Sequence, residues 1–455
     1  MLRHIFTLIL CCFSLIIAAQ DQTEDALYIK KIYNQILTEG ACYDWLTDLS
    51  TDIGGRLAGS AGADAAVVYT KSIMDTLGLD KVYLQDCMVP HWERGKAEQV
   101  VAYSSTGDKT LKATALGNSI GGKAKAEIIE VFSLEEVEKL GRSEIEGKIV
   151  FYNRPMDATQ IRTFNAYGGA VDQRGRGPAM ASRFGAVGSV VRSMTTKTDM
   201  VPHTGVTIFN DDKPIPAVAI STMDADWLSA QLEKGKVEIS MSTSSRILPD
   251  KPSHNVIGEI VGSTFPDKII LVGGHLDSWD IGGGAHDDGA GCVHVMRVLQ
   301  TMKRLGYQPR HTIRCVLFMN EENGLGGATA YADASNDKGE FHMAALESDA
   351  GGFTPRGFSV DGDNSIFAPK FKAMTEWLPL LEPFGLSLAK GGGGADINPL
   401  KSQKGVLIGF RPDSQRYFDF HHTADDTIDA VNQRELELGA ASITSLIYLI
   451  DKYGL

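Results

Sequence analysis

The chain has 455 residues, of which 43% are hydrophobic and 22% are charged. These proportions are ordinary for a globular protein and exclude a collagen-like, coiled-coil or wholly disordered chain. Lysine and arginine total 44 against 57 acidic residues, so the formal charge is −13. An acidic chain lacks the basic surface that a nucleic-acid binder or a protein docked on an anionic membrane needs, so neither partner is expected.

Residues 1–19 are predicted to be a secretory signal peptide. A basic start at Arg3 is followed by an apolar run to Ile17 and by small residues that end at Ala19. A membrane anchor is disfavoured because spanning a bilayer takes ~20 apolar residues. A lipoprotein site at Cys11 is disfavoured because Cys11 lies too early in the run. We therefore expect a secreted or periplasmic protein with no membrane partner after cleavage.

The beginning of the mature chain is predicted to be helical. Apolar residues recur at helical spacing over 24–37 and 65–77, and a glycine-rich loop lies between these two segments. The segment 81–90 is predicted to be a strand. The composition changes after about residue 110, which suggests that a second unit begins there.

Residues 111–247 are predicted to form an inserted β-rich domain. Short strand signals alternate with short helical pieces and lie at 126–132, 148–153, 188–192, 216–220 and 237–241. The pattern on either side of this stretch is different. The remainder, 20–110 and 248–455, is therefore predicted to be one discontinuous catalytic domain.

The chain beyond residue 255 alternates strands with helices. Strands are predicted at 268–273, 312–319, 342–348 and 406–410, and helices at 289–305 and 432–452. This alternation predicts an α/β fold in which helices cover both faces of a sheet. Ligand-binding residues in such sheets lie just beyond the carboxyl ends of the strands.

Acidic and histidine side chains occur at these positions. They follow the three strands up to residue 348, open the helix at 289 and lie in a loop near the C-terminus: His275, Asp277, Asp287, Glu321, Glu322, Asp349, His421 and His422. A lone histidine is usually solvated, and an Asp-Asp-Gly is more often a turn or a helix cap. The recurrence at successive strand ends is what indicates a site.

These residue types suit a pair of zinc ions. Zinc binds histidine nitrogen and carboxylate oxygen, and two ions ~3.5–4 Å apart need a shared carboxylate and about two further ligands each. The chain offers such a set in His275, Asp287, Glu322, Asp349 and His422. Asp287 opens a helix and suits the bridging role. Glu321 is then free to take a proton from the attacking water, and Asp277 is placed to accept the second N–H of His275.

The motifs HLDSWD, GAHDDGAG, NEENG, ESDAGG and HHTADDT together resemble the M28 family of dizinc metallopeptidases. The segments 90–95, 254–257, 274–280 and 396–398 are similar to one group within it, the plasma glutamate carboxypeptidases. The resemblance covers nearly all of the mature chain. It implies a zinc-exopeptidase-type mixed sheet, an insert of the protease-associated type, two Zn²⁺ per chain and a homodimer.

The same resemblance implies the roles given above to the five ligands, to Glu321 as general base and to Asp277 as support for His275. Many members of the family have tyrosine before the last histidine, whereas this chain has His421. We expect His421 to donate a hydrogen bond to the developing oxyanion. The alternative is that His421 only packs or binds a carboxylate.

Residues 391–394 are four glycines, which is a second departure from many relatives. This loop is predicted to shape the substrate pocket, and Asp396 is predicted to meet a free amino group of the substrate. The alternative is a structural turn.

The mature chain has four cysteines. An exported chain permits a disulfide between Cys42 and Cys87, and the sequence alone does not decide whether it forms. Cys292 and Cys315 lie in apolar patterns and are predicted to be core residues.

The sequence thus predicts an exported zinc exopeptidase that hydrolyses dipeptides or short peptides. One alternative is a single-zinc acyltransferase on the same fold, such as a glutaminyl cyclase, which needs only three protein ligands. The other is a binding protein with an inactive peptidase fold, and such proteins lose ligands. All five predicted ligands are present here.

Overall fold

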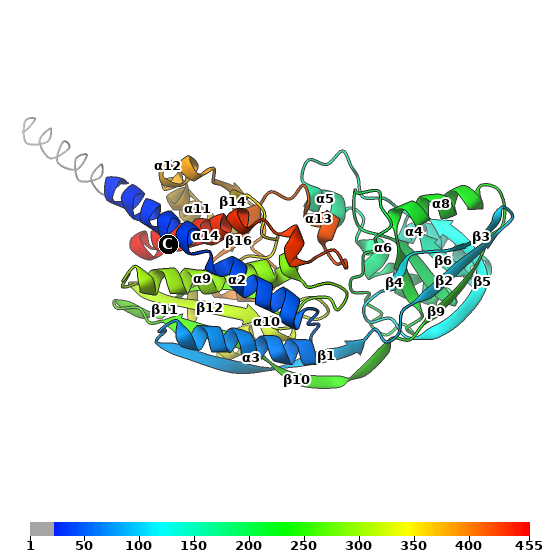
Figure 1. The fold of residues 1–455 in the computed structure, drawn as a ribbon, viewed down its shortest axis with the longest axis horizontal. Helices are drawn as coiled ribbons and strands as arrows, with labels where there is room; N and C mark the ends of the chain where they lie inside the picture. Colours follow the sequence, from blue (N-terminus) through cyan, green and yellow to red (C-terminus); the bar gives the residue numbers. More distant parts are fainter. Residues whose placement is uncertain (1–21) are drawn as a thin grey trace, which may run out of the picture.

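The computed structural model describes residues 22–455, and the predicted signal peptide lies outside that range. Two eight-stranded sheets form the molecule and lie beside each other along its long axis (Figure 1). The long strands β1 (Lys81–Glu93) and β10 (Arg246–Ile260) pair antiparallel and lead from the first sheet to the second. The structure is therefore a mixed α/β fold, as predicted.

The first sheet has the strand order β1-β10-β12-β11-β13-β16-β14-β15. Its parallel centre consists of β12 (His311–Phe318), β11 (Phe265–His275), β13 (Phe341–Glu347) and β16 (Val406–Pro412). Two further strands form one edge, namely β14 (Pro355–Gly362) and β15 (Ser387–Lys390). The four central strands confirm the four strands predicted beyond residue 255, whereas β10, β14 and β15 were not predicted.

Helices cover both faces of this sheet. One face carries α2 (Ala41–Thr47), α3 (Ala61–Thr76), α9 (Ala290–Arg304) and α14 (Gln433–Tyr453), and the other carries α10 (Gly326–Asp337). Every residue of α9 from Ala290 to Met302 is buried. A helix that is enclosed on all sides belongs in the core, and the N-terminal end of α9 is thereby fixed against the carboxyl end of β11.

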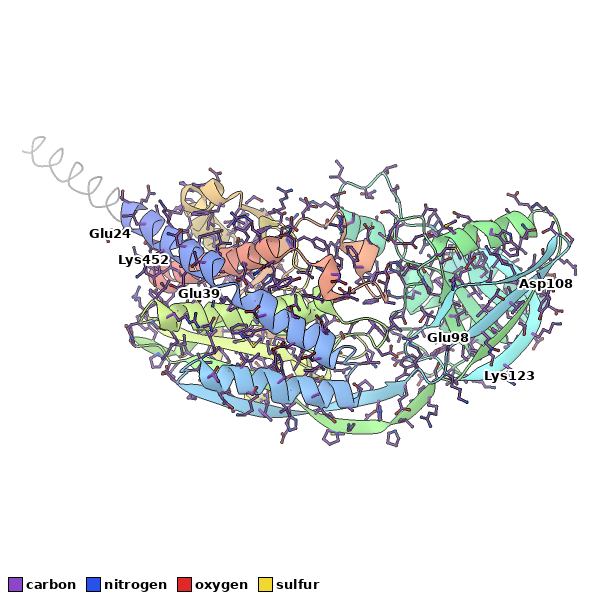
Figure 2. All side chains as sticks on the ribbon, in the orientation of Figure 1. Glu24, Glu39, Glu98, Asp108, Lys123 and Lys452 are labelled. Carbon is purple, nitrogen blue, oxygen red and sulfur yellow. The ribbon has the colours of Figure 1, made fainter. Side chains whose placement is uncertain are left out.

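The two ends of the described chain lie together. Residues 22–39 are helical, and the buried carboxylate of Asp25 accepts a hydrogen bond of 2.6 Å from the hydroxyl of Tyr448 on α14. Figure 2 shows Glu24 and Lys452 at one end of the molecule and Asp108 at the opposite end. The first helix is thus held against the last one, far from the second sheet.

The second sheet has the order β3-β2-β9-β5-β6-β7-β8-β4. Its strands are β2 (Gln99–Ser104), β3 (Gly107–Thr110), β4 (Ala113–Ala115), β5 (Gly122–Val131), β6 (Ile149–Tyr152), β7 (Gly188–Arg192), β8 (Ala217–Ile220) and β9 (Glu238–Thr243). The five strands predicted in this part of the chain are confirmed. β2 and β3 precede residue 111, yet β2 pairs with β9 and so belongs to the second sheet. Because β9 lies far from β2 in the sequence, no local sequence pattern indicates that β2 belongs to the second sheet.

Helices of the second unit are α4 (Leu134–Ile145), α5 (Thr163–Gly168), α6 (Asp172–Gly175), α7 (Gly177–Arg183) and α8 (Thr222–Leu232). Of these, α5 and α6 lie on the side that faces the first sheet (Figure 1). Apolar clusters fill both faces of the sheet, and one of them includes Phe353, Tyr417 and Phe418 from the C-terminal part of the chain. The two units therefore share a packed interface beside the carboxyl end of the first sheet.

All four cysteines of the described chain are buried and free. The Cys42–Cys87 disulfide that export permits is therefore not formed in this structure. Cys292 and Cys315 are core residues, as predicted. Among residues 22–455, no helix has the length and apolar character needed to cross a membrane.

Candidate metal centre

The predicted site residues lie at one edge of the first sheet, beyond the carboxyl ends of its central strands. His275 ends β11, Glu321 and Glu322 follow β12, and Asp349 follows β13. Asp287 lies in the turn Ala285–Gly289 that opens α9, and His421 and His422 follow α13 (Tyr417–Phe420). The parallel strands thereby bring together side chains that are far apart in the sequence.

Asp287 is the centre of the arrangement. Its Oδ1 lies 3.3 Å from Nε2 of His275, and its Oδ2 lies 3.3 Å from Nε2 of His422. Asp349 Oδ1 is 3.6 Å from the same nitrogen of His275, and Glu322 Oε2 is 3.1 Å from that of His422. The five residues therefore form two groups that share Asp287, which is the arrangement a carboxylate-bridged pair of metal ions requires.

Buried atoms without partners indicate that these groups fit a cation. Within the described residues, Asp287 Oδ2 and Glu322 Oε1 are buried and accept no hydrogen bond. A small hollow of about 10 Å³ is lined by Asp287, Glu322 and His422, among others. Buried carboxylates are unfavourable unless they are paired or bind a metal. Histidine nitrogens together with carboxylate oxygens are the donors that zinc prefers.

Asp277 holds the loop that carries the two glutamates. Its buried carboxylate accepts the backbone N–H groups of Asn320 at 2.7 Å, Glu321 at 3.0 Å and Glu322 at 3.3 Å. We expected this carboxylate to accept the N–H of His275. Instead, Nδ1 of His275 lies 3.0 Å from the backbone carbonyl of Asp277 and 3.8 Å from its carboxylate. The carboxylate is engaged by the three backbone donors, so the carbonyl orients the imidazole.

Two supporting carboxylates were missed in the sequence. Asp288 accepts the backbone N–H of His275 at 3.1 Å, and Asp426 accepts that of Asp287 at 3.1 Å. Both side chains are buried and fix the backbone of predicted ligands. The sequence marks both residues only by an Asp-Asp pair, in GAHDDGAG for Asp288 and in HHTADDT for Asp426. Such pairs are more often turns or helix caps.

His421 lies against the same centre. Its ring stacks on that of His422 with centroids 3.5 Å apart, and its Nε2 lies 3.7 Å from Asp287 Oδ2. Asp287, His421 and His422 each offer a ligand atom within 4.8 Å of the others. Burial lowers the pKa of His421 well below its ordinary value, and the charges of His422 and Arg174 add to this effect. The imidazole is therefore neutral and is placed either to donate a hydrogen bond or to bind a metal.

Glu321 differs from its neighbour Glu322. Its side chain is partly exposed, and no ion pair of its carboxylate occurs within residues 22–455. Burial, against the opposing charge of His275, raises the pKa of Glu321 to about 8. A carboxylate with a raised pKa is a stronger base, which suits proton transfer near neutral pH.

The second unit contributes to this site through Arg174, which lies on α6. Its guanidinium lies 3.3 Å from Nδ1 of His422 and donates a hydrogen bond of 2.7 Å to the hydroxyl of Tyr167. The backbone carbonyl of Thr204 also lies 3.3 Å from His422 Nδ1. The outer nitrogen of this imidazole is thus held by residues of the second unit, which sequence patterns did not reveal.

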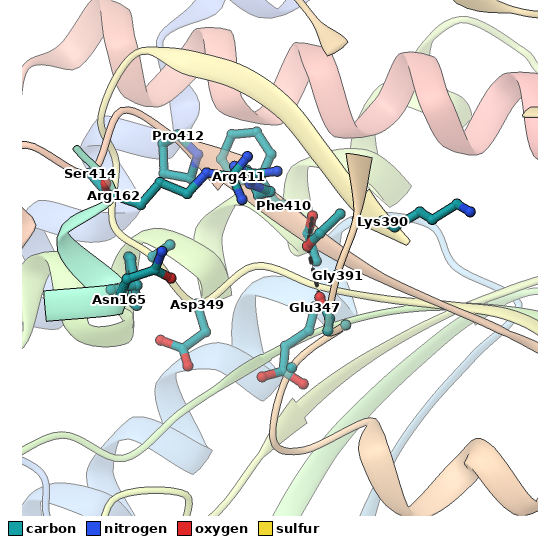
Figure 3. Close-up of a pocket in the computed structure, with 17 residues that line it drawn as sticks. Arg162, Asn165, Glu347, Asp349, Lys390, Gly391, Phe410, Arg411, Pro412 and Ser414 are labelled. Atoms are coloured by element: carbon teal, nitrogen blue, oxygen red, sulfur yellow. Dashed lines mark hydrogen bonds between the residues drawn. The ribbon is translucent and has the colours of Figure 1, made fainter. Parts of the chain in front are cut away.

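A cavity of about 460 Å³ opens beside Asp349 (Figure 3). Its lining includes Glu347 and the four glycines at 391–394, so the predicted role of that loop in shaping a pocket agrees with its place. Gly394 has a φ of 144°, and a Cβ there would lie 2.2 Å from the Glu347 carboxyl carbon. Only glycine permits this approach.

Asp396 does not line this cavity, although we expected it to meet the substrate. It is 1% exposed, and both carboxylate oxygens lack a hydrogen-bond partner within the described chain. Burial and then the charge of Glu347 raise its pKa well above the ordinary value. The backbone N–H groups of Ala395 and Ile397 bind Glu347 at 3.0 Å each. The loop therefore wraps around Glu347, and Glu347 rather than Asp396 lines the cavity.

These buried acids predict how pH affects the metal-free protein. Burial raises the pKa of Glu347 to about 8 and that of Asp426 to about 7, above ordinary values near 4. Between pH 7.5 and 8.5 the folded state therefore holds protons that the unfolded chain has lost, so stability falls as pH rises. Buried histidines such as His286, with a pKa of about 4, have the opposite effect, because stability rises with pH while the unfolded imidazole loses its proton around pH 6.5. This effect is nearly complete at about pH 7.5, so the acids dominate above that pH.

We expect the melting temperature of chelator-treated protein to be lower at pH 8.5 than at pH 7.5, as measured by circular dichroism. The fall should shrink in Glu347→Gln, because the amide does not ionise. It should also shrink when zinc is restored, because a bound cation stabilises the ionised carboxylates. A melting temperature that rises over this interval would contradict the assignment of these acids.

Several known proteins are similar to this chain. The profile of Peptidase family M28 matches residues 255–446. Carboxypeptidase Q of Xenopus laevis is 36% identical over 90% of this chain and 85% of the relative. Carboxypeptidase Q of Homo sapiens is 34% identical over 90% of this chain and 84% of the relative. Carboxypeptidase Q is another name for the plasma glutamate carboxypeptidase group that four segments of the sequence resemble.

Solved structures agree in fold. A peptidase M28 precursor from Shewanella amazonensis has a TM-score of 0.89 and 32% identity, over 95% of this chain and 98% of that one. A zinc aminopeptidase from Bacillus subtilis has a TM-score of 0.65 and 20% identity, over 91% and 95% of the two chains. At that identity the second structure supports the fold alone.

Proposed function

This chain belongs to peptidase family M28 and is a zinc metallo-exopeptidase, and we propose that it hydrolyses dipeptides and short peptides with a free N-terminus by means of two zinc ions. The observation that carries the proposal is the sharing of Asp287 between His275 and His422 at 3.3 Å each. One group comprises His275 and Asp349 and the other His422 and Glu322, so each would hold one ion.

The protein residues divide the work of hydrolysis. Bound zinc supplies Lewis acidity, which lowers the pKa of water and polarises a carbonyl. Glu321 takes a proton from the attacking water and passes it to the leaving amine. His421 donates a hydrogen bond to the carbonyl oxygen as negative charge develops there, in the role that tyrosine has in many relatives. Asp277 keeps Glu321 in place through the backbone of its loop.

Carboxyl groups beside the cavity favour a substrate with a free amino group. Glu347 and Asp349 line the cavity, and Asp396 lies beneath the same loop. Burial and mutual repulsion favour the protonated forms of Glu347 and Asp396, and a substrate ammonium would favour the ionised forms and pair with them. We assign this role to Glu347 first and to Asp396 as the acid that supports it.

Further features of the protein are proposals of the same kind. Residues 1–19 direct export and are removed, residues 111–247 form an insert of the protease-associated type, and two chains form a homodimer. The N-terminal sequence of the exported protein would test the first of these. Light scattering of the purified protein would test the last, and a monomeric mass would refute it.

The function is tested by counting metal ions while measuring hydrolysis. We expect mature protein from Gln20 to contain about two zinc ions and to cleave a dipeptide panel until a chelator is added. One zinc ion without cleavage would favour a cyclase, which can be assayed on peptides with N-terminal glutamine. Protein with neither metal nor activity would be a binding protein, and the proposal would fail.

A further inference from the structure

Two arginines face the cavity from different units of the fold. Arg162 lies in the loop between β6 and α5 of the second unit, and Arg411 lies on β16 of the first sheet. Figure 3 shows both side chains on the side of the cavity opposite the carboxylates of Glu347 and Asp349. The cavity is therefore basic on one side and acidic on the other.

Neither arginine is neutralised by the protein. Within residues 22–455, no ion pair or side-chain hydrogen bond of Arg162 or Arg411 is formed, whereas Arg356 on the neighbouring strand pairs with Asp413 at 2.8 Å. Burial lowers the pKa of Arg411, and the charge of Arg162 lowers it further. Two like charges thus lie close together beside a cavity, without an anion between them.

An anion that enters the cavity would relieve this repulsion. The planar guanidinium binds a carboxylate through two parallel hydrogen bonds, which is the strongest arrangement available to these groups. The volume of about 460 Å³ lies within the range of small-ligand sites. The cavity also borders Asp349, a predicted zinc ligand, so a molecule held here would reach the reacting centre.

We propose that Arg162 and Arg411 form the subsite for a carboxylate of the peptide substrate. This inference rests on the proposed peptidase function. The C-terminal carboxylate is the source we favour, because a dipeptide carries an ammonium and a carboxylate only a few atoms apart. Glu347 and the arginine pair would then bind opposite ends of one small molecule. Longer peptides carry their two charges too far apart, so the subsite would select dipeptides.

The position of Arg162 gives the second unit a function. This residue comes from a loop of the second unit, so the substrate site is complete only when that unit lies against the first sheet. The same interface places the guanidinium of Arg174 3.3 Å from Nδ1 of His422. The second unit would therefore determine substrate choice as well as support a metal ligand.

The test compares a free dipeptide with its amide. We expect the zinc-loaded protein to cleave Ala-Leu about 10- to 100-fold more efficiently in kcat/KM than Ala-Leu amide, mainly through KM, since hydrogen bonds between charged groups have such a strength. Arg162→Ala and Arg411→Ala should each lower kcat/KM for the free dipeptide much more than for the amide, so that the preference is lost. Arg162→Lys should retain part of it, because the charge remains but the paired hydrogen bonds are lost.

A binding measurement and two controls complete the test. Calorimetry with a reduced-bond analogue of Ala-Leu and with its amide should show the same preference without turnover. Arg183→Ala, at an exposed arginine of α7, should change nothing. Ala-Glu amide distinguishes the carboxylate sources: cleavage as fast as that of Ala-Leu, and sensitive to Arg162→Ala, would assign the subsite to a side-chain carboxylate instead.

Two results would separate the failure of this inference from that of the function. If the protein cleaves acid and amide equally, or if both arginine variants lower the two rates alike, the carboxylate subsite is refuted while the peptidase remains. If zinc-loaded protein cleaves neither peptide, the proposed function itself fails.

Discussion

Glu321→Gln is expected to lower kcat for dipeptide hydrolysis by about 10³-fold, within the range attributed to general bases. Glutamine has the same shape but cannot accept a proton at neutral pH. The Glu321 backbone would still be held by Asp277 at 3.0 Å, so the loop should not move. Because Glu321 belongs to neither group around Asp287, the variant should retain both zinc ions.

The measurement pairs steady-state kinetics with zinc content determined by mass spectrometry. Glu382→Gln is a matched control, because Glu382 is exposed, lies in the short helical turn before β15 and does not line the cavity. Normal turnover by Glu321→Gln would overturn the base assignment. A loss of zinc in this variant would show instead that Glu321 is a ligand, and the roles of Glu321 and Glu322 would need to be exchanged.

The sequence predicted the parts of this site that depend on local signals. The strands β11 and β12 each contain a mainly apolar run, and site residues lie at or just beyond their ends, His275 as the last residue of β11 and Glu322 four residues beyond β12. Parallel strands place such residues at one edge of the sheet whatever their separation in the chain. Chemistry and position therefore pointed to the same five side chains, and the structure brings those five together.

Other features depend on contacts between distant segments, which leave no local pattern. Glu347 is the last residue of β13 and looked like part of the strand, yet the loop of Ala395 folds over it and leaves it at the cavity. Asp396, which looked like the exposed acid of that loop, is buried beneath it. Arg162 and Arg174 reach the site only because the second unit packs against the first. A single sequence does not encode that interface in any recognisable spacing.

Removing the shared carboxylate should affect the metal content more than any other single change. In Asp287→Ala we expect zinc to fall from about two ions per chain to less than one and dipeptide hydrolysis to fall to background, because each group loses a donor. His275→Ala and His422→Ala should each lose mainly one ion, since Asp287 remains with the other histidine at 3.3 Å. Asp287→Asn should give an intermediate content, because its amide oxygen is neutral.

Zinc per chain after dialysis against buffer is the readout, and circular dichroism checks that each variant is folded. Asp75→Ala is the control, because the one ion pair of Asp75 within residues 22–455 is with Lys71 on the surface of α3, and such pairs contribute little. If Asp287→Ala binds two ions, the sites do not share this residue. If His275→Ala loses both ions, the two groups are coupled through more than Asp287. His421, whose Nε2 lies 3.7 Å from Asp287, would then be the first residue to test as an additional ligand.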